Sequence, residues 1–208
     1  MSETGKRPGA LALFVGSAPL LSALSVLAVL AGAAGLFVLF FAKPHLIDRA
    51  LHDPEERLEL LGAVLTSAAA AVAAFRIHVR GRTLRWRVTP LVLFVVWQAL
   101  TVSYCIDVPL DKPAEQLLYG HSPDCFLFIL ATSIPIALLL FPLLRLHRAH
   151  LGWSASAMAG LAISSAAVAL LQFFHGFEMN LGDWGIHMLA MGIVVGCSAY
   201  VGQVLPTR

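Results

Sequence analysis

The chain has 208 residues, of which 59% are hydrophobic and only 12% are charged. Soluble domains carry roughly twice that share of charged residues, so the composition excludes an ordinary water-soluble protein. The formal net charge is only +2, and the chain offers no large polar segment as a platform for nucleic acid, so nucleic-acid binding is excluded as well.

Six apolar stretches, each close to twenty residues, run along the chain. Each is long enough to cross a hydrocarbon core of roughly 30 Å as a helix, which satisfies its own backbone hydrogen bonds in lipid. The alternation typical of membrane β-strands is missing. The sequence therefore predicts an all-α membrane protein, a single domain over 1–208 built as a six-transmembrane-helix bundle. We expect a short arm at 1–18 and spans at 19–42, 58–79, 88–106, 124–144, 154–174 and 184–204.

The charges between these spans alternate in sign. Ten of the fourteen Lys and Arg residues fall in the segments on one side of the membrane, and eleven of the twelve acids fall in the segments on the other side. Because Lys and Arg in short loops mark the cytoplasmic side, the N-terminus and the C-terminus are both predicted to be cytoplasmic. A cleaved signal peptide is an alternative reading of the first span. The uncharged stretch from Pro8 to Ala42 is much longer than a signal core of about 7–15 residues, which favours a retained helix.

Local patterns predict how several spans begin and pack. Asp53 and Pro54 are typical of an N-cap and first helical position, so the second helix should begin there. Gln98 is the most interior polar side chain of the third span and is expected to bond a neighbouring helix. Small residues four positions apart on the last two spans predict close helix packing; they are Ser156, Gly160 and Ser164, and Gly192 and Gly196. Trp86, Trp153 and Trp184 lie near span ends and are expected to act as interface anchors.

Candidate reactive side chains gather on the predicted outer face. Cys105 ends the third span and Cys125 begins the fourth, and three histidines lie in or beside the outer loops: His121, His175 and His187. Cys125 follows Ser122 and Pro123, a pattern for a helix start, so it should lie in a first turn where the helix dipole favours a reactive thiol. Asp124 opposes this effect by its like charge.

Two interpretations of these residues remain open at this point. One is a disulfide between Cys105 and Cys125, since the outer side of a bacterial membrane is oxidising. The other is a soft-metal site using Cys125 with His175 and His187, because thiolate and imidazole together suit zinc and copper(I). A regulatory metal ion is thus a possible ligand, and no other cofactor is predicted.

The predicted inner face is rich in arginine. Four of these residues join the second and third spans and two follow the fourth: Arg80, Arg82, Arg85 and Arg87, and Arg145 and Arg148. Such residues attract anionic membrane lipid, and they are also candidates for docking an acidic cytoplasmic partner.

Two segments resemble a known family. Gly120 to Ile129, and the stretch from Phe174-His175 through Asp183 to His187, are similar to the NrsF-type multi-pass anti-sigma factors, whose name abbreviates negative regulator of sigma F. The resemblance implies a bacterial inner-membrane protein, not an enzyme, that holds an extracytoplasmic-function sigma factor inactive. It also implies sensing of metal or oxidative stress through outer cysteines. Cys125 matches a family cysteine and His175 and His187 match family histidines, whereas His175-Gly176 occupies the place of a second cysteine.

Two other functions compete with this one. A small metal or solute transporter would need polar residues along a midplane path, and the chain offers only Gln98, Thr132 and Ser133. A membrane dithiol redox protein would use Cys105 and Cys125 as its reactive pair.

Overall fold

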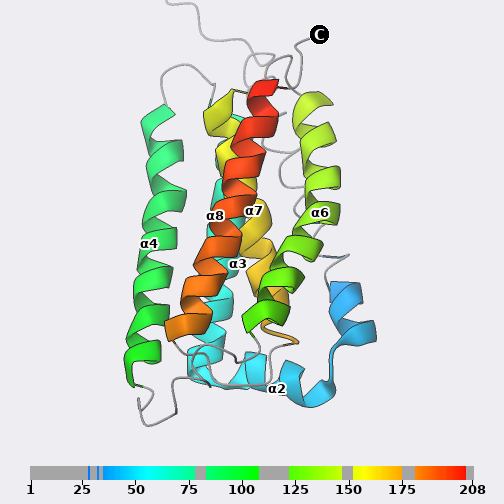
Figure 1. The fold of residues 1–208 in the computed structure, drawn as a ribbon, viewed down its shortest axis with the longest axis vertical. Coiled ribbons are helices and arrows are strands. Elements are labelled where there is room, and N and C mark those ends of the chain that lie inside the picture. Colours follow the sequence, from blue (N-terminus) through cyan, green and yellow to red (C-terminus); the bar gives the residue numbers. More distant parts are fainter. Residues whose placement is uncertain are drawn as a thin grey trace, which may run out of the picture.

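The computed structural model describes Ala28, Gly32 and residues 35–77, 83–107, 122–146, 152–174 and 181–204. Its elements are all helices: α2 (Pro44–His52), α3 (Pro54–Arg76), α4 (Thr83–Asp107), α6 (Ser122–Leu146), α7 (Trp153–Leu171) and α8 (Leu181–Val204). A further helical segment at residues 35–41 precedes α2. Figure 1 shows α3, α4, α6, α7 and α8 side by side as a bundle, with α2 lying across one end. The predicted all-α fold is confirmed for the described residues.

Five of the described helices are long and apolar enough to cross a membrane: α3, α4, α6, α7 and α8. Each overlaps one of the predicted second to sixth spans, and the boundaries differ by only a few residues at the described ends. The predicted first span, 19–42, and the arm at 1–18 lie mostly outside the described residues, so the count of six stays a prediction. Large apolar side chains are exposed along the outside of the bundle, among them Leu39, Val95 and Leu138, as expected for a surface that faces lipid.

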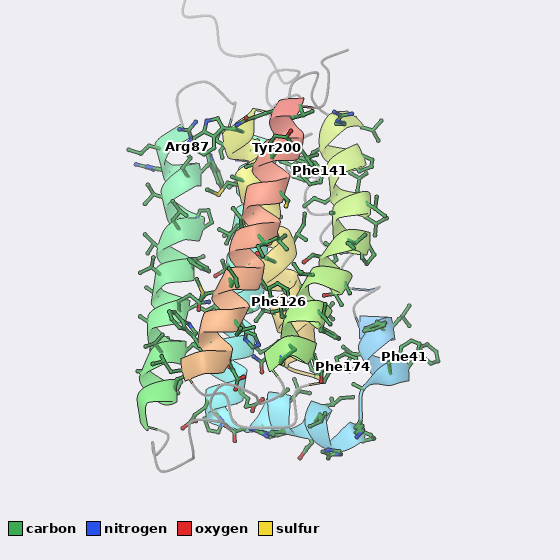
Figure 2. The ribbon with its side chains drawn as sticks, in the orientation of Figure 1. Phe41, Arg87, Phe126, Phe141, Phe174 and Tyr200 are labelled. Carbon is green, nitrogen blue, oxygen red and sulfur yellow. The ribbon has the colours of Figure 1, made fainter. Side chains whose placement is uncertain are left out.

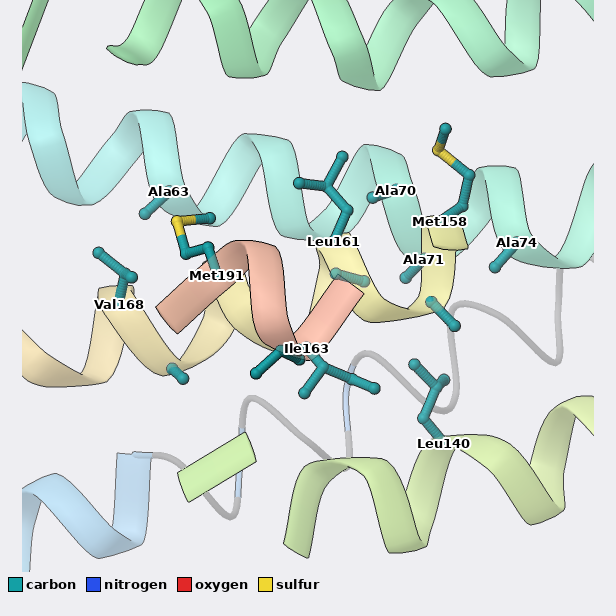
Figure 3. Packing of buried hydrophobic residues seen from close by; sticks show 14 of the residues in the cluster. Ala63, Ala70, Ala71, Ala74, Leu140, Met158, Leu161, Ile163, Val168 and Met191 are labelled. Carbon is teal, nitrogen blue, oxygen red and sulfur yellow. The ribbon is translucent and has the colours of Figure 1, made fainter. Parts of the chain in front are cut away.

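Helix α7 forms the centre of the bundle. It packs against α3, α6 and α8, and most of its residues are buried. Its sequence consists largely of Ala, Ser and Gly, which let neighbouring backbones approach closely in lipid. Figure 3 shows the resulting core, in which alanines of α3 face Met158, Leu161 and Val168 of α7. Ser67 of α3 donates a hydrogen bond of 2.8 Å to the carbonyl of Ala162, which ties these two helices together.

The small residues of α7 and α8 have different roles. A Cβ atom on Gly160 would lie 2.7 Å from the Cβ of Ser198 and 2.8 Å from the Cα of Val195, so the absence of a side chain at Gly160 allows α7 and α8 to approach closely. Gly192 and Gly196 are exposed, and no described residue lies within 4 Å of a Cβ placed there. The prediction of close packing is therefore confirmed for Gly160 and wrong for Gly192 and Gly196 within the described bundle.

The beginning of α3 follows the predicted pattern. Asp53 is the N-cap, and its carboxylate accepts a 3.0 Å hydrogen bond from the backbone N–H of Glu55, with Pro54 at the first helical position. Glu55 and Glu56 occupy the first turn, where the helix dipole favours negative charge. This cap ends the short amphipathic helix α2, whose Leu46 and Ala50 are buried, and turns the chain into the bundle.

The two ends of the bundle carry opposite charges. The described acids all lie in α2, at the start of α3, α6 or α8, or at the end of α4, and we call this the acidic end. The opposite end holds Arg76, Arg85, Arg87 and Arg145 and no acid among the described residues, and we call it the arginine end. Figure 2 shows Arg87 at the arginine end and Phe174 toward the acidic end.

Candidate functional site

Both candidate cysteines lie at the acidic end. Cys105 is in the last turn of α4 and Cys125 in the first turn of α6, where the sequence predicted them. Their side chains are buried, with 6% and 4% of their surface exposed. Both thiols are free in this structure, so no disulfide joins them in the state described.

Asp183 brings the two thiols into one environment. It lies in the first turn of α8, which packs against both α4 and α6. Its side chain is only 2% exposed, and it lies near enough to Cys105 and Cys125 for a carboxylate there to influence both thiols electrostatically. The first turn of a helix is a favourable place for a buried carboxyl group, because the backbone N–H groups there are unpaired.

Helices α3 and α7 contribute a second carboxylate and an amide. Glu59, one turn after Glu56, lies near Cys105 and is hydrogen-bonded to the side chain of Gln172 at the end of α7. Gln172 is buried and Glu59 is half-buried, so the amide can supply a hydrogen bond to the carboxylate where water is partly excluded. Two buried thiols and two carboxylates therefore lie at the same end of helices α3, α4, α6 and α8.

His187 belongs to the same region. It follows Asp183 by four residues on α8, so the two side chains lie on one face of the helix, and both are buried. We call the set of Cys105, Cys125, Glu59, Gln172, Asp183 and His187 the thiol–carboxylate site. Three of its members were candidates from the sequence, and the structure places all three at the acidic end: Cys105, Cys125 and His187.

The metal interpretation depends on side chains outside this set. Among the described residues, no three His, Cys, Asp or Glu side chains are placed to hold a metal ion together. His121 and His175 lie outside the described residues, so their part in the site stays a prediction. A metal held by the cysteines would need an imidazole from one of these two positions or a rearrangement of the helix ends.

A side-chain hydrogen bond links α4 and α8 beside the site. The indole Nε1 of Trp184 donates to Oε1 of Gln98 at 2.9 Å. The prediction that Gln98 bonds a neighbouring helix is confirmed, and Trp184 has this role in addition to any at the membrane interface.

Helix α4 also packs closely against α3. The ring of Trp97 lies against Gly62 of α3, where an added Cβ would come within 2.5 Å of the ring.

Replacing Gln98 with leucine is expected to weaken the attachment of α4 to α8. The change leaves a half-buried indole N–H of Trp184 without its acceptor, and interhelical hydrogen bonds of this kind contribute about 0.5–2 kcal/mol in membranes. The measurement is the thermal unfolding midpoint of the purified protein in detergent. Gln98→Glu keeps an acceptor oxygen, so its unfolding midpoint should fall by less than that of Gln98→Leu. If the midpoint falls equally in both variants, the hydrogen bond does not contribute to stability.

The two polar residues that the sequence placed on a possible midplane path bond within their own helix. Thr132 donates to the carbonyl of Phe128 at 2.7 Å, and Ser133 donates to that of Ile129 at 2.7 Å. Because both hydroxyls already have an acceptor within α6, these two residues do not favour the transporter interpretation.

The arginine end carries the other candidate residues. Arg85, Arg87 and Arg145 are exposed, as a docking surface would require. The guanidinium of Arg76 stacks over the ring of Trp86 at 5.0 Å from its centroid, so this arginine already has a partner within the bundle. Arg80, Arg82 and Arg148 lie outside the described residues.

Sequence reasoning did not single out Glu59 or Gln172. The signal that could have found Glu59 is its register: it shares one face of α3 with Ala63, Thr66 and Ala70, which are all fully buried. A carboxylate on a small-residue stripe points into a helix bundle rather than toward lipid.

Searches of curated proteins and of solved structures found no match to this chain. A comparison with protein-family models gave a match to NrsF, described as negative regulator of sigma F, over residues 15–206. That match includes the whole described bundle and both candidate cysteines. The chain therefore belongs to the NrsF family of negative regulators of sigma F.

Proposed function

We propose that this protein is an anti-sigma factor of the bacterial inner membrane that holds an extracytoplasmic-function sigma factor inactive. It releases the sigma factor when metal or oxidative stress acts on thiols at the outer face. Membership of a family of negative sigma regulators supports the regulatory part of this function. The proposed stimulus and its site go beyond the family name.

The observation that carries the proposal is that the thiols and the exposed arginines lie at opposite ends of the bundle. Cys105, Cys125 and Asp183 lie at the acidic end, whereas Arg85 and Arg87 lie at the arginine end. Under the rule that arginine-rich ends face the cytoplasm, the thiols face the periplasm. They are then in the compartment where thiol oxidation takes place, and the arginines are on the side where a sigma factor resides.

The thiols can respond to oxidants by ordinary chemistry. A peroxide accepts two electrons as the two thiols of Cys105 and Cys125 form one S–S bond, and the two thiol protons leave with the reduced oxygen as water. Because α8 packs against both α4 and α6, a new bond between these two cysteines would shift both helices relative to the first turn of α8. A soft metal would act on the same groups by drawing a thiolate and an imidazole together.

The regulated output requires a second arrangement of the bundle. The stimulus must bind or react better in the released state than in the repressing state, since only such a difference shifts the population. At the other end, exposed arginines would meet an acidic surface of the sigma factor, which favours fast and specific association.

A transcriptional reporter for the cognate sigma factor tests the function. Deleting the gene should raise reporter expression without stress, and Cys125→Ser should abolish the response to stress. Cys197→Ser is the matched control, because this thiol is exposed on α8, away from the acidic end, and its loss should leave the response intact. A reporter that stays silent after deletion would refute the anti-sigma function, and a full response by Cys125→Ser would refute the thiol site.

A further inference from the structure

A line of aromatic rings joins the thiol–carboxylate site to the end of the predicted first span. The ring centroid of Phe128 on α6 lies 5.4 Å from that of Phe174, which follows α7. Phe174 in turn lies 5.5 Å from Phe37 in the helical segment 35–41. Both separations are in the range of favourable aromatic pairs, so three parts of the chain meet at Phe174.

The line begins beside the site. Phe128 is three residues after Cys125 on the same helix, and Phe174 is two residues after Gln172, which bonds Glu59. Figure 2 shows Phe174 between the bundle and the segment that carries Phe41. A displacement at the start of α6 would therefore move Phe128, and one at the end of α7 would move Phe174. Phe37 contacts Phe174 directly and Phe128 only through it.

A second contact holds the same part of the chain. Helix α2 directly follows the segment 35–41, and its Arg49 forms an ion pair with Glu56 of α3, one turn before Glu59. The Glu56 side chain is 16% exposed, so the pair is better shielded than an ordinary surface pair. This contact attaches α2 to α3. The aromatic line is a separate contact, which joins segment 35–41 to α6 and to the residues that follow α7.

We propose that Phe37, Phe174 and Phe128 are positioning residues that hold the outer end of the first span in its repressing position. This inference rests on the proposed function. In this proposal, stacking of the rings belongs to the repressing state. Reaction at Cys125 disturbs Phe128, the contact through Phe174 weakens, and segment 35–41 is released.

Alanine substitutions at two rings test this coupling with the sigma-factor reporter. Phe37→Ala and Phe174→Ala should each raise unstimulated expression by roughly 2- to 10-fold, the population shift that corresponds to the loss of one aromatic pair. Phe40→Ala is the matched control: Phe40 lies in the same segment and is 79% exposed, and its loss should leave expression unchanged. The amount of each variant in the membrane is measured alongside.

The double variant separates coupling from general damage. If both rings act through one contact, Phe37→Ala with Phe174→Ala should raise expression no further than the stronger single variant. Independent, multiplying effects would overturn the proposal, as would expression equal to that of Phe40→Ala at normal membrane levels. Should Phe174→Ala fail to accumulate, Phe37→Ala decides alone, because Phe37 is already 38% exposed and its loss opens little space in the core. Release by gene deletion without release by these variants would reject the coupling and leave the anti-sigma function standing.

Discussion

Replacing Asp183 with alanine should lower the free energy of unfolding by about 2–4 kcal/mol, the range for breaking a buried polar network. Asp183 is 2% exposed and takes part in interactions inside the bundle. Alanine removes its carboxylate but leaves the groups around it buried, and these cannot recover the lost interactions from water. The measurement is the unfolding free energy of the purified protein in detergent.

Two substitutions serve as controls for this result. Asp124→Ala removes an acid from the same kind of position, the first turn of α6, but Asp124 is exposed, so it should change stability only slightly. Asp183→Asn keeps the shape and one acceptor oxygen but replaces the other oxygen with an NH2 donor, so its effect should lie between those of the two alanine variants. Equal effects of Asp183→Ala and Asp124→Ala would mean that the acidic end is open to water.

Replacing Gly160 with leucine should prevent α7 and α8 from packing together. Even the first added atom would lie 2.8 Å from the Cα of Val195, and backbone cannot rotate away as a side chain can. Ordinary overpacking costs about 1–3 kcal/mol, and we expect a loss at or above the top of that range. The amount of folded protein recovered from membranes, and its thermal unfolding midpoint, measure this loss.

Gly192→Leu is the matched control for Gly160→Leu. Both changes raise helix propensity by the same amount, but no described residue lies within 4 Å of a Cβ at Gly192. Leucine there should leave folding and stability unchanged. A severe effect of Gly192→Leu, with a mild effect of Gly160→Leu, would show that the wrong face of α8 has been assigned to the bundle.

The helices were predictable because lipid imposes a length and a composition on each span. Asp53 caps α3 and Pro54 is its first residue, and this start was predictable because capping depends on neighbouring residues alone. Helix α6 begins at Ser122, within one residue of the predicted start. It was harder to predict which face of each helix is buried in the bundle. Gly160 and Gly192 look alike in the sequence, and only the position of α7 decides that the first is buried and the second exposed.

The candidate site was predictable in part for the same reason. Cys105, Cys125 and His187 could be assigned to one end of the bundle from the spans alone. In the sequence analysis Glu59 was only one of the eleven acids on the predicted outer side. A single carboxylate hardly alters the hydropathy of a long apolar stretch, so the span pattern did not single it out. Its meeting with Gln172 and Cys105 depends on which helices are neighbours, and a sequence of spans does not specify that order.

The central position of α7 has a consequence for how the protein is made. A ribosome completes α3, α4 and α6 before α7, yet α3 and α6 both pack against α7. Helix α3 can already pack against α4, but α6 lacks the helix that joins it to this pair until α7 enters the membrane. In nascent chains that stop short of Trp153, α6 should therefore stay separate from the α3–α4 pair and be open to quality-control proteases, and its protection should begin once α7 has been inserted.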